Sequence, residues 1–331
     1  MNGTHSPARA VRALGIGIVL AGAFTSFAHA AVSVGYGQAT SDVANRPAAS
    51  ITPAQAQALH QKIIGGGART NYSGAGSLLE YSFPQNPADK ANGVPWGYSA
   101  NWVAGSRDHE VADPATISAF DVVLIDTQEQ YIVRQFQAEG AVAPHPHAEV
   151  MLPAGFVMTG GGCGVEEPDS AAGNMLVASY PVVTTNPDGS VVSKWVCDSK
   201  DHDVPSPAGL GAYVIGVKPA NTSVKVPAMC ISQAVSAVAA HPSVQVGNTC
   251  MPGGRGFITG GGALAQTNGP GQLLTGSFPI WNGPAVVWAA SSKDHMHASP
   301  GTVTTFAIVV DFDPPVRPII TRPTVHVPGS P

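Results

Sequence analysis

The alternation of apolar and polar residues along this chain predicts many short strands. The predicted strands are rich in β-branched residues and are bounded by glycine and proline. Thr52 is suited to cap a helix and Pro53 to take its first position, so we expect one helix over Ala54–Ile63. The sequence therefore predicts an all-β protein with a single helix. The clearest strands are Val122–Ile125, Val214–Val217, Val286–Trp288 and Thr302–Val310.

The same series of residues occurs three times in the chain. Each copy has a triple glycine, a Ser-aromatic-Pro, a tryptophan, a Ser-Lys/Arg-Asp-His, a proline and a final aromatic residue. The tryptophans and the Asp-His pairs recur at intervals of 93 residues. Agreement in order and spacing at this many positions indicates three units of common origin. The triple glycines are Gly65–Gly67, Gly160–Gly162 and Gly260–Gly262, and we expect a bulge or a close backbone approach there.

Two architectures fit three β-rich units: a closed threefold (β-prism-like) arrangement, which we favour, and three tandem sandwiches. The segment before copies two and three (141–146 and 237–242) is absent from our alignment of copy one, where we expect the helix instead. The tail resembles residues 218–227, so we expect it to supply the strand that copy one lacks and to close a ring. The predicted divisions are a signal peptide at 1–30, an N-terminal segment with repeat 1 at 31–126, repeat 2 at 127–217, repeat 3 at 218–313 and the tail at 314–331.

The first thirty residues have the parts of a secretory signal peptide. Arg9 and Arg12 precede an apolar run over Leu14–Phe24, and Ala28-His29-Ala30 has the form of a cleavage site. We therefore expect a protein that is secreted or periplasmic. The repeat alignment favours two disulfides, each within one copy, among the three pairings that four cysteines allow. These are Cys163–Cys197 and Cys230–Cys250.

Composition and charge exclude several classes of function. Charged residues make up 11% of the chain, and the net charge of −5 leaves no basic stripe, so we expect no nucleic-acid partner. No other apolar run approaches the length of about 20 residues that a membrane-spanning helix needs. The triple glycines lack the Gly-Lys-Ser/Thr ending of a phosphate-binding loop, and no Gly-x-Ser-x-Gly elbow is present. Glu166 and Glu167 lie in a predicted loop, where we expect them to be solvated.

The third copy resembles a repeat found in secreted bacterial proteins. It contains Cys250-Met-Pro-Gly-Gly, the triple glycine at 260–262, Ser277-Phe-Pro279 and Trp288. The repeat in those proteins has a Cys-Pro-x-Gly stretch, a triple glycine, a Ser-x-Pro and a tryptophan before a final aromatic strand. Met251 between Cys and Pro departs from that pattern, and copy one has no cysteine. The resemblance implies export and β structure and implies no activity.

The repeated Trp and Ser-Lys/Arg-Asp-His set is the first candidate for a binding site. An aromatic face beside a carboxylate and a cation can hold a sugar ring. Three histidines around a threefold axis could instead form a His₃ metal site. A third interpretation is structural, with the aspartate capping a turn and the histidine packing beneath the proline. The predicted ligand-binding residues are Trp102, Arg107, Asp108, His109, Trp195, Lys200, Asp201, His202, Trp288, Lys293, Asp294 and His295. Trp96 and Trp281 lie outside the repeat and are further candidates for exposed stacking surfaces.

A second candidate is the run His145-Pro-His147-Ala-Glu149, whose side chains would share one face of a strand. They could ligate a divalent metal, but His147 and Glu149 align with Ser243 and Gln245 of copy three, which favours a structural role for the repeated His-Pro.

We expect an exported protein that binds extracellular carbohydrate, or another cell-surface ligand, through up to three repeated sites, with no obligatory cofactor. We prefer binding to catalysis because the candidate site is repeated three times. The alternatives are a metal-assisted or polysaccharide-acting hydrolase and a purely structural envelope protein.

Overall fold

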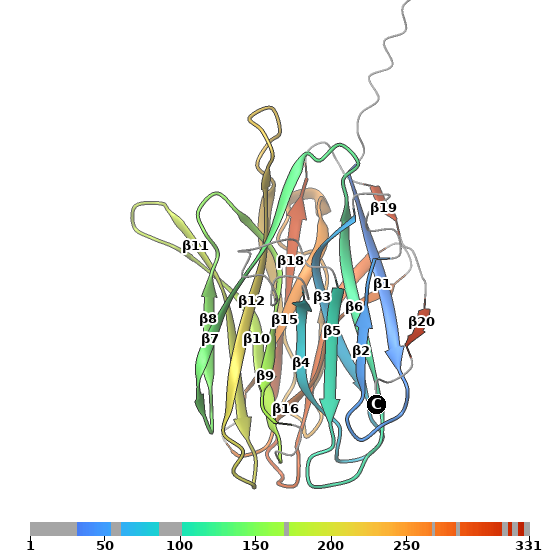
Figure 1. Ribbon diagram of the computed structural model, residues 1–331. Helices are drawn as coiled ribbons and strands as arrows, with labels where there is room; N and C mark the ends of the chain where they lie inside the picture. Colours follow the sequence, from blue (N-terminus) through green and yellow to red (C-terminus); the bar gives the residue numbers. More distant parts are fainter. Residues whose placement is uncertain are drawn as a thin grey trace, which may run out of the picture.

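The computed structural model describes residues 32–53, 61–85, 101–168, 172–266, 269–282, 285–312, 317–319 and 324–327. These residues form three β-sheets, and the strands run along the long axis of an elongated body (Figure 1). Within the described ranges the only helical element is a 3₁₀ turn, Pro252–Gly254. The structure confirms the all-β prediction and the closed threefold arrangement. The predicted signal peptide lies outside the described residues.

Among the described residues, each copy contributes six strands in the same order. In copy one they are β1 (Ser33–Ser41), β2 (Ala48–Ile51), β3 (Gln61–Asn71), β4 (Leu78–Gln85), β5 (Asn101–Arg107) and β6 (Thr116–Ile125). In copy two they are β7 (Tyr131–Ala143), β8 (His147–Met151), β9 (Val157–Glu166), β10 (Asn174–Thr185), β11 (Val191–Asp201) and β12 (Ala208–Pro219). In copy three they are β13 (Ala228–Val235), β14 (Ser243–Val246), β15 (Phe257–Gln266), β16 (Leu273–Asn282), β17 (Ala285–Lys293) and β18 (Thr302–Asp311).

No sheet belongs to a single copy. Sheet I (β2-β5-β4-β9-β12-β7) joins copies one and two, and sheet II (β13-β18-β15-β10-β11-β8) joins copies two and three. Sheet III (β14-β17-β16-β3-β6-β1-β19, with β20 also pairing β1) joins copies three and one. The junctions are the antiparallel pairs β4–β9, β10–β15 and β16–β3. Three equivalent junctions close the ring.

The C-terminal tail does not close the ring, which corrects our expectation. Copy one already has the strand in question, because β1 pairs antiparallel with β6 as β7 does with β12 and β13 with β18. The tail strands β19 (Arg317–Ile319) and β20 (Thr324–Val327) pair in parallel with the other edge of β1. The tail therefore covers one edge of sheet III, an edge that would otherwise be open to pairing with another chain.

Two further expectations for copy one need correction. The predicted helix does not reach Ile63, because residues 61–63 belong to β3, while residues 54–60 lie outside the described part. Copy one also has the connector that the alignment missed. The Asp108 amide donates to the Asn45 carbonyl, as Asp201 donates to Pro144 and Asp294 to Ala240. The connector of copy one is therefore the segment around Asn45.

Each glycine of the triple lies at a different close contact. At the first, a Cβ on Gly65 would lie 2.0 Å from the Thr259 carbonyl oxygen, since the first glycines of the three copies meet around the axis. At the second, a Cβ on Gly66 would lie 2.4 Å from the Trp102 indole, and Gly161 and Gly261 face their own tryptophans in the same way. The third approaches the backbone of the neighbouring copy, as at Gly67 and Ser277. The predicted close approach is confirmed, and the strand registers shift at each triple glycine, which is the predicted bulge.

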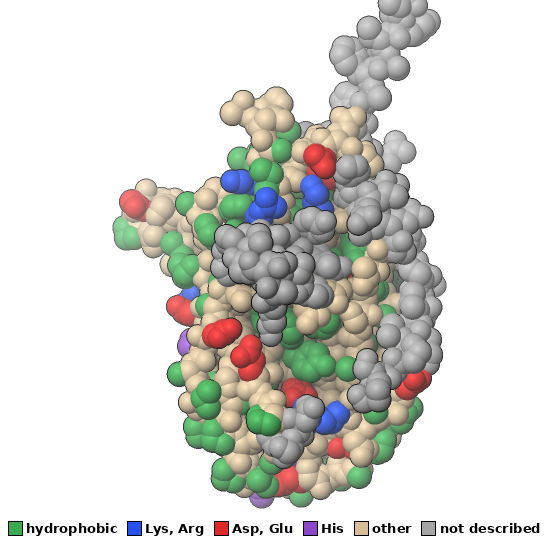
Figure 2. All heavy atoms as spheres, viewed as in Figure 1, with side chains coloured by type: hydrophobic (Ala, Val, Ile, Leu, Met, Phe, Trp, Pro, Cys, Tyr) green, Lys and Arg blue, Asp and Glu red, His purple; other side chains and the backbone are tan. Residues whose placement is uncertain are grey.

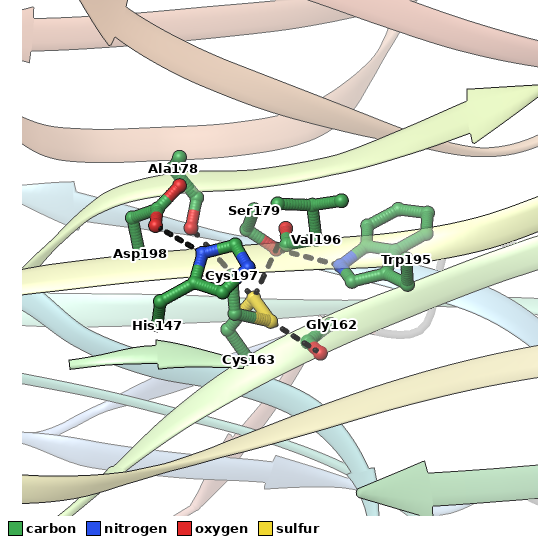
Figure 3. Close-up of a disulfide and its surroundings, with 9 residues drawn as sticks. All are labelled: His147, Gly162, Cys163, Ala178, Ser179, Trp195, Val196, Cys197 and Asp198. Carbon is green, nitrogen blue, oxygen red and sulfur yellow. Dashed lines mark hydrogen bonds and ion pairs between the residues drawn. A yellow bond between two sulfur atoms is a disulfide. The ribbon is translucent and has the colours of Figure 1, made fainter. Parts of the chain in front are cut away.

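Both predicted disulfides are formed. Cys163 of β9 and Cys197 of β11 link sheet I to sheet II, and Cys230 and Cys250 are joined within copy three. Figure 3 shows the first link beside the Trp195–Ser179 hydrogen bond. In copies one and three the positions of the first disulfide are taken by buried alanines, Ala68 with Ala104 and Ala263 with Ala290. The interior therefore accommodates either a disulfide or a pair of alanines at this position.

Candidate functional site

The three repeated tryptophans belong to the core. Trp102, Trp195 and Trp288 are fully buried, and each indole N–H donates to a serine hydroxyl of its own copy. The accepting serines are Ser82, Ser179 and Ser277, at 3.0, 3.1 and 2.9 Å. A buried indole packed on a glycine has no face to offer a sugar. The stacking role that the sequence suggested for these tryptophans is therefore corrected to a packing role.

The basic residue of the motif ties its copy to the next one. The Arg107 guanidinium lies 2.7 Å from Glu167 Oε1 of copy two and 3.2 Å from Glu80 Oε1. Lys200 donates to the carbonyls of Pro270 and Gly271 in copy three, and Lys293 to those of Gly74 and Gly76 in copy one. These side chains hold neighbouring copies together through an ion pair or hydrogen bonds. Glu167, which we expected to be solvated, has a fully buried carboxylate.

The aspartate of the motif caps a turn, as the structural interpretation proposed. Asp108, Asp201 and Asp294 each accept a hydrogen bond from the backbone N–H five residues further on. The distances are 2.8, 3.1 and 2.9 Å. The repeated geometry fixes the loop that follows each of β5, β11 and β17. This loop carries the histidine.

The three histidines of the motif meet one another. The ring centres of His109, His202 and His295 are 5.9, 5.1 and 5.2 Å apart, although the residues are separated by 93 positions in sequence. Their exposed fractions are 0, 3 and 1%. Burial lowers the pKa of all three rings, that of His202 to about 4, so the imidazoles are neutral at neutral pH. Of the sequence-predicted set, only the histidines converge on one place.

The backbone after each histidine is strained in the same way. Glu110, Asp203 and Met296 have φ of 55, 60 and 57°, a region that side chains other than glycine rarely occupy. In each copy the amide two positions beyond the histidine donates back to the histidine carbonyl, at 2.5 to 2.6 Å. Strain of this kind clusters at functional sites. Here it holds three buried imidazoles against one another.

The run His145, His147 and Glu149 comes together only in part, with His147 Nε2 lying 3.8 Å from Glu149 Oε2. His147 Nδ1 lies 2.7 Å from Asp198 Oδ1 on the neighbouring strand (Figure 3), and Lys194 Nζ is 2.5 Å from Glu149 Oε2. His145 turns instead toward Asp201, at 3.4 Å. The Lys194 ammonium satisfies the carboxylate that a cation would need. The geometry offers no common ligand position for the metal that the sequence suggested at these three residues.

A repeated feature that the sequence analysis did not select lies on the outer faces of the sheets. The aromatic residue of each Ser-aromatic-Pro stacks on the final aromatic residue of a neighbouring copy, with ring centres 4.6 to 5.5 Å apart and planes within 22°. The pairs are Phe83–Tyr213 on sheet I, Tyr180–Phe306 on sheet II and Phe278–Phe120 on sheet III. The sequence signal that could have located these pairs was strand alternation. The serine before each aromatic residue points inward to a tryptophan, so the aromatic residue itself points to the outer face.

Charged groups surround two of these pairs. Burial raises the pKa of Tyr180, and the charges of Asp198, Lys194 and Glu149 act on the same hydroxyl. Burial also raises the pKa of Tyr213 to about 12, with Glu166 and Glu139 nearby. Figure 2 looks onto sheet I, where hydrophobic side chains are exposed in the middle of the face and acidic side chains lie beside them. Aromatic faces bordered by carboxylates are thus present on two sheets.

On sheet III the corresponding pair adjoins a pocket of about 420 Å³. Phe278 and Ile280 of β16 line it together with residues of β14 and β17. Trp281 packs edge-on against Tyr36 and at a tilt against Phe120, and is half-buried, whereas Trp96 lies outside the described residues. All three faces therefore combine an aromatic pair with a concave or charged surrounding.

No protein-family model matches this chain, and no curated protein matches it. The described part of the chain contains no helix long and apolar enough to cross a membrane. Together with its two disulfides, the structure is compatible with an oxidising compartment.

Proposed function

We propose that this is an exported binding protein that recognises extracellular carbohydrate on the outer faces of its sheets. The observation that carries the proposal is the Tyr180–Phe306 pair on sheet II, stacked at 5.3 Å and bordered by Glu149, Lys194 and Asp198. Both rings are half-buried, so each keeps some surface accessible. A sugar can stack its apolar face on such a ring while its hydroxyls hydrogen-bond to the surrounding charges.

The threefold recurrence of the aromatic pair supports binding over catalysis. Equivalent pairs occupy sheets I and III, but both rings of the sheet III pair and Tyr213 of the sheet I pair are buried, whereas Phe83 is half-buried. Partly exposed aromatic rings on sheets I and II provide two weak sites, which raise the apparent affinity for a polymer that spans them. The expected ligand is therefore a polysaccharide or a densely glycosylated surface, and the site is the aromatic pair instead of the Trp-Lys/Arg-Asp-His motif.

A glycan array probed with the purified exported protein tests the proposal. We expect binding to one class of glycan, and we expect Tyr180→Ala to weaken it at least about fivefold, since an aromatic contact contributes roughly 1 kcal/mol. Thr184→Ala, an exposed change on the same strand, is the matched control and should bind as the parent does. A folded protein that binds no glycan on the array overturns the proposal, as does full binding by the Tyr180→Ala variant combined with Phe83→Ala.

A further inference from the structure

Independently of carbohydrate binding, the buried histidines have a chemistry that packing alone does not explain. Both ring nitrogens of His109 and of His202, and Nε2 of His295, have no hydrogen-bond partner within the described part of the chain. Buried polar atoms are almost always satisfied in native proteins. Three aromatic residues of similar size would fill this space without leaving polar atoms unpaired. Retention of imidazole in all three copies points to a ligand that imidazole binds.

The hydrogen bonds around the cluster leave Nε2 available as a lone-pair donor. His295 Nδ1 lies 3.1 Å from the Ala75 carbonyl oxygen, which can only accept, so the proton resides on Nδ1. His202 Nδ1 lies 3.0 Å from Asp203 Oδ2 without the geometry of a hydrogen bond, so both of its ring nitrogens are open to a ligand. Histidines that ligate metals are characteristically oriented through the second nitrogen by a carbonyl or a carboxylate. Asp203 is itself held by His297 Nε2, at 2.9 Å.

The spacing of the rings fits a single ion. An ion bound by imidazole nitrogens at about 2.1 Å lies roughly 3.2 Å from each ring centre, so tetrahedral ligation places the centres about 5 Å apart. The observed separations are 5.1, 5.2 and 5.9 Å. Ligand atoms of His109, His295 and Glu110 already lie within 4.8 Å of one another. His202 lies outside that group of ligand atoms, but its ring centre is 5.9 Å from that of His109 and 5.2 Å from that of His295.

We propose that His109, His202 and His295, together with Glu110, bind one divalent transition-metal ion on the pseudo-threefold axis. Imidazole nitrogen with one carboxylate suits Zn²⁺ and its neighbours in the first transition row, whereas Ca²⁺ and Mg²⁺ prefer oxygen ligands. Only copy one has a glutamate after the histidine. Copy two has Asp203, which lies 3.0 Å from His202 Nδ1, and copy three has Met296. The copies therefore supply complementary parts of one asymmetric site.

The test is Zn²⁺ and Co²⁺ binding to the purified full protein after treatment with a chelator. We expect calorimetry to give about one Zn²⁺ per chain, and Co²⁺ to give the visible absorption of a tetrahedral complex. His109→Ala should lose both signals, and Glu110→Gln, an exposed change, should weaken Zn²⁺ affinity at least about tenfold. His147→Ala removes an exposed histidine elsewhere and is the matched control, which should bind as the parent does.

Thermal melting separates a metal site from a packing cluster if a variant folds poorly. Because His109→Leu removes unpaired polar atoms, the metal-free variant should melt at or above the parent temperature. With excess Zn²⁺ the order should reverse, since an ion that binds only the folded state raises the melting temperature of the parent alone. Equal stabilisation of both proteins by Zn²⁺ overturns the proposal. So does Zn²⁺ binding that His147→Ala abolishes and His109→Ala leaves intact.

Discussion

Copies one and two trace the same six strands, yet they differ in how they stabilise their interior. Copy one places the Arg107 guanidinium between two carboxylates, where copy two uses Lys200 and two carbonyls. Copy two has a disulfide where copy one has Ala68 and Ala104. The positions nearest the axis, glycine, tryptophan and histidine, are the same in both. Repetition thus preserves what meets at the axis, and leaves the contacts between copies open to different chemical solutions.

Replacing Arg107 should cause the largest loss of stability, measured as the free energy of unfolding, among the changes that distinguish copies one and two. Arg107→Met leaves Glu167 buried without its cation, whereas Glu80 keeps Arg46 at 2.9 Å, and breaking a buried ion pair costs about 3–5 kcal/mol. Lys200→Met is the matched change in copy two and should cost about 1 kcal/mol, because only neutral carbonyls lose a donor. Denaturant unfolding at neutral pH measures both. Equal losses would show that the two side chains contribute in the same way.

Making copy two resemble copy one should have the next largest effect. Replacing Cys163 and Cys197 together by alanine gives the pair that copies one and three already have. The packing is retained, so the expected loss of about 3 kcal/mol arises mainly from the greater freedom of the unfolded chain. The midpoint of urea unfolding checks this value. A loss below about 1 kcal/mol would mean that the link constrains the unfolded chain little.

A buried carboxyl group gives the smallest expected effect, and one that depends on pH. Burial raises the pKa of Asp121 to about 7, and Val214 stands at the same place in copy two. The folded state then holds a proton that the unfolded chain releases near pH 4, so stability should fall as the pH rises from about 4 to 7. Asp121→Asn should remove this slope and make the protein more stable than the parent at pH 8. If the free energy of unfolding changed by the same amount between pH 5 and pH 8 in parent and variant, the assignment would be contradicted.

The repeat, the strands and the disulfides could be predicted because each leaves a local trace in the sequence. The 93-residue spacing located the equivalent residues, and the cysteine positions within copies gave the pairing. The predicted helix end at Ile63 was wrong, because helix-start signals at Thr52 and Pro53 say nothing of the strand partners that residues 61–63 find in β6. Tertiary pairing overrode a local preference.

The roles of the repeated residues could be narrowed to alternatives but not decided, because the repeat spacing does not reveal which way each side chain points. The spacing shows that Trp102, Lys200 and His295 belong to one motif, but their side chains go to the core, to the next copy and to the axis. The outer aromatic pairs were missed for the same reason. Their partners come from different copies, so only the exchange of strands between sheets brings Tyr180 to Phe306.

That exchange of strands also bears on how such a chain could arise. A single copy translated alone would hold one half of each of two sheets, with a raw edge on β3 and on β4 or their counterparts. It could satisfy those edges only by joining two more of its kind around a threefold axis, as symmetric oligomers do. Duplication and fusion of such a gene would turn a homotrimer into one polypeptide, and only then could the three histidine loops diverge independently.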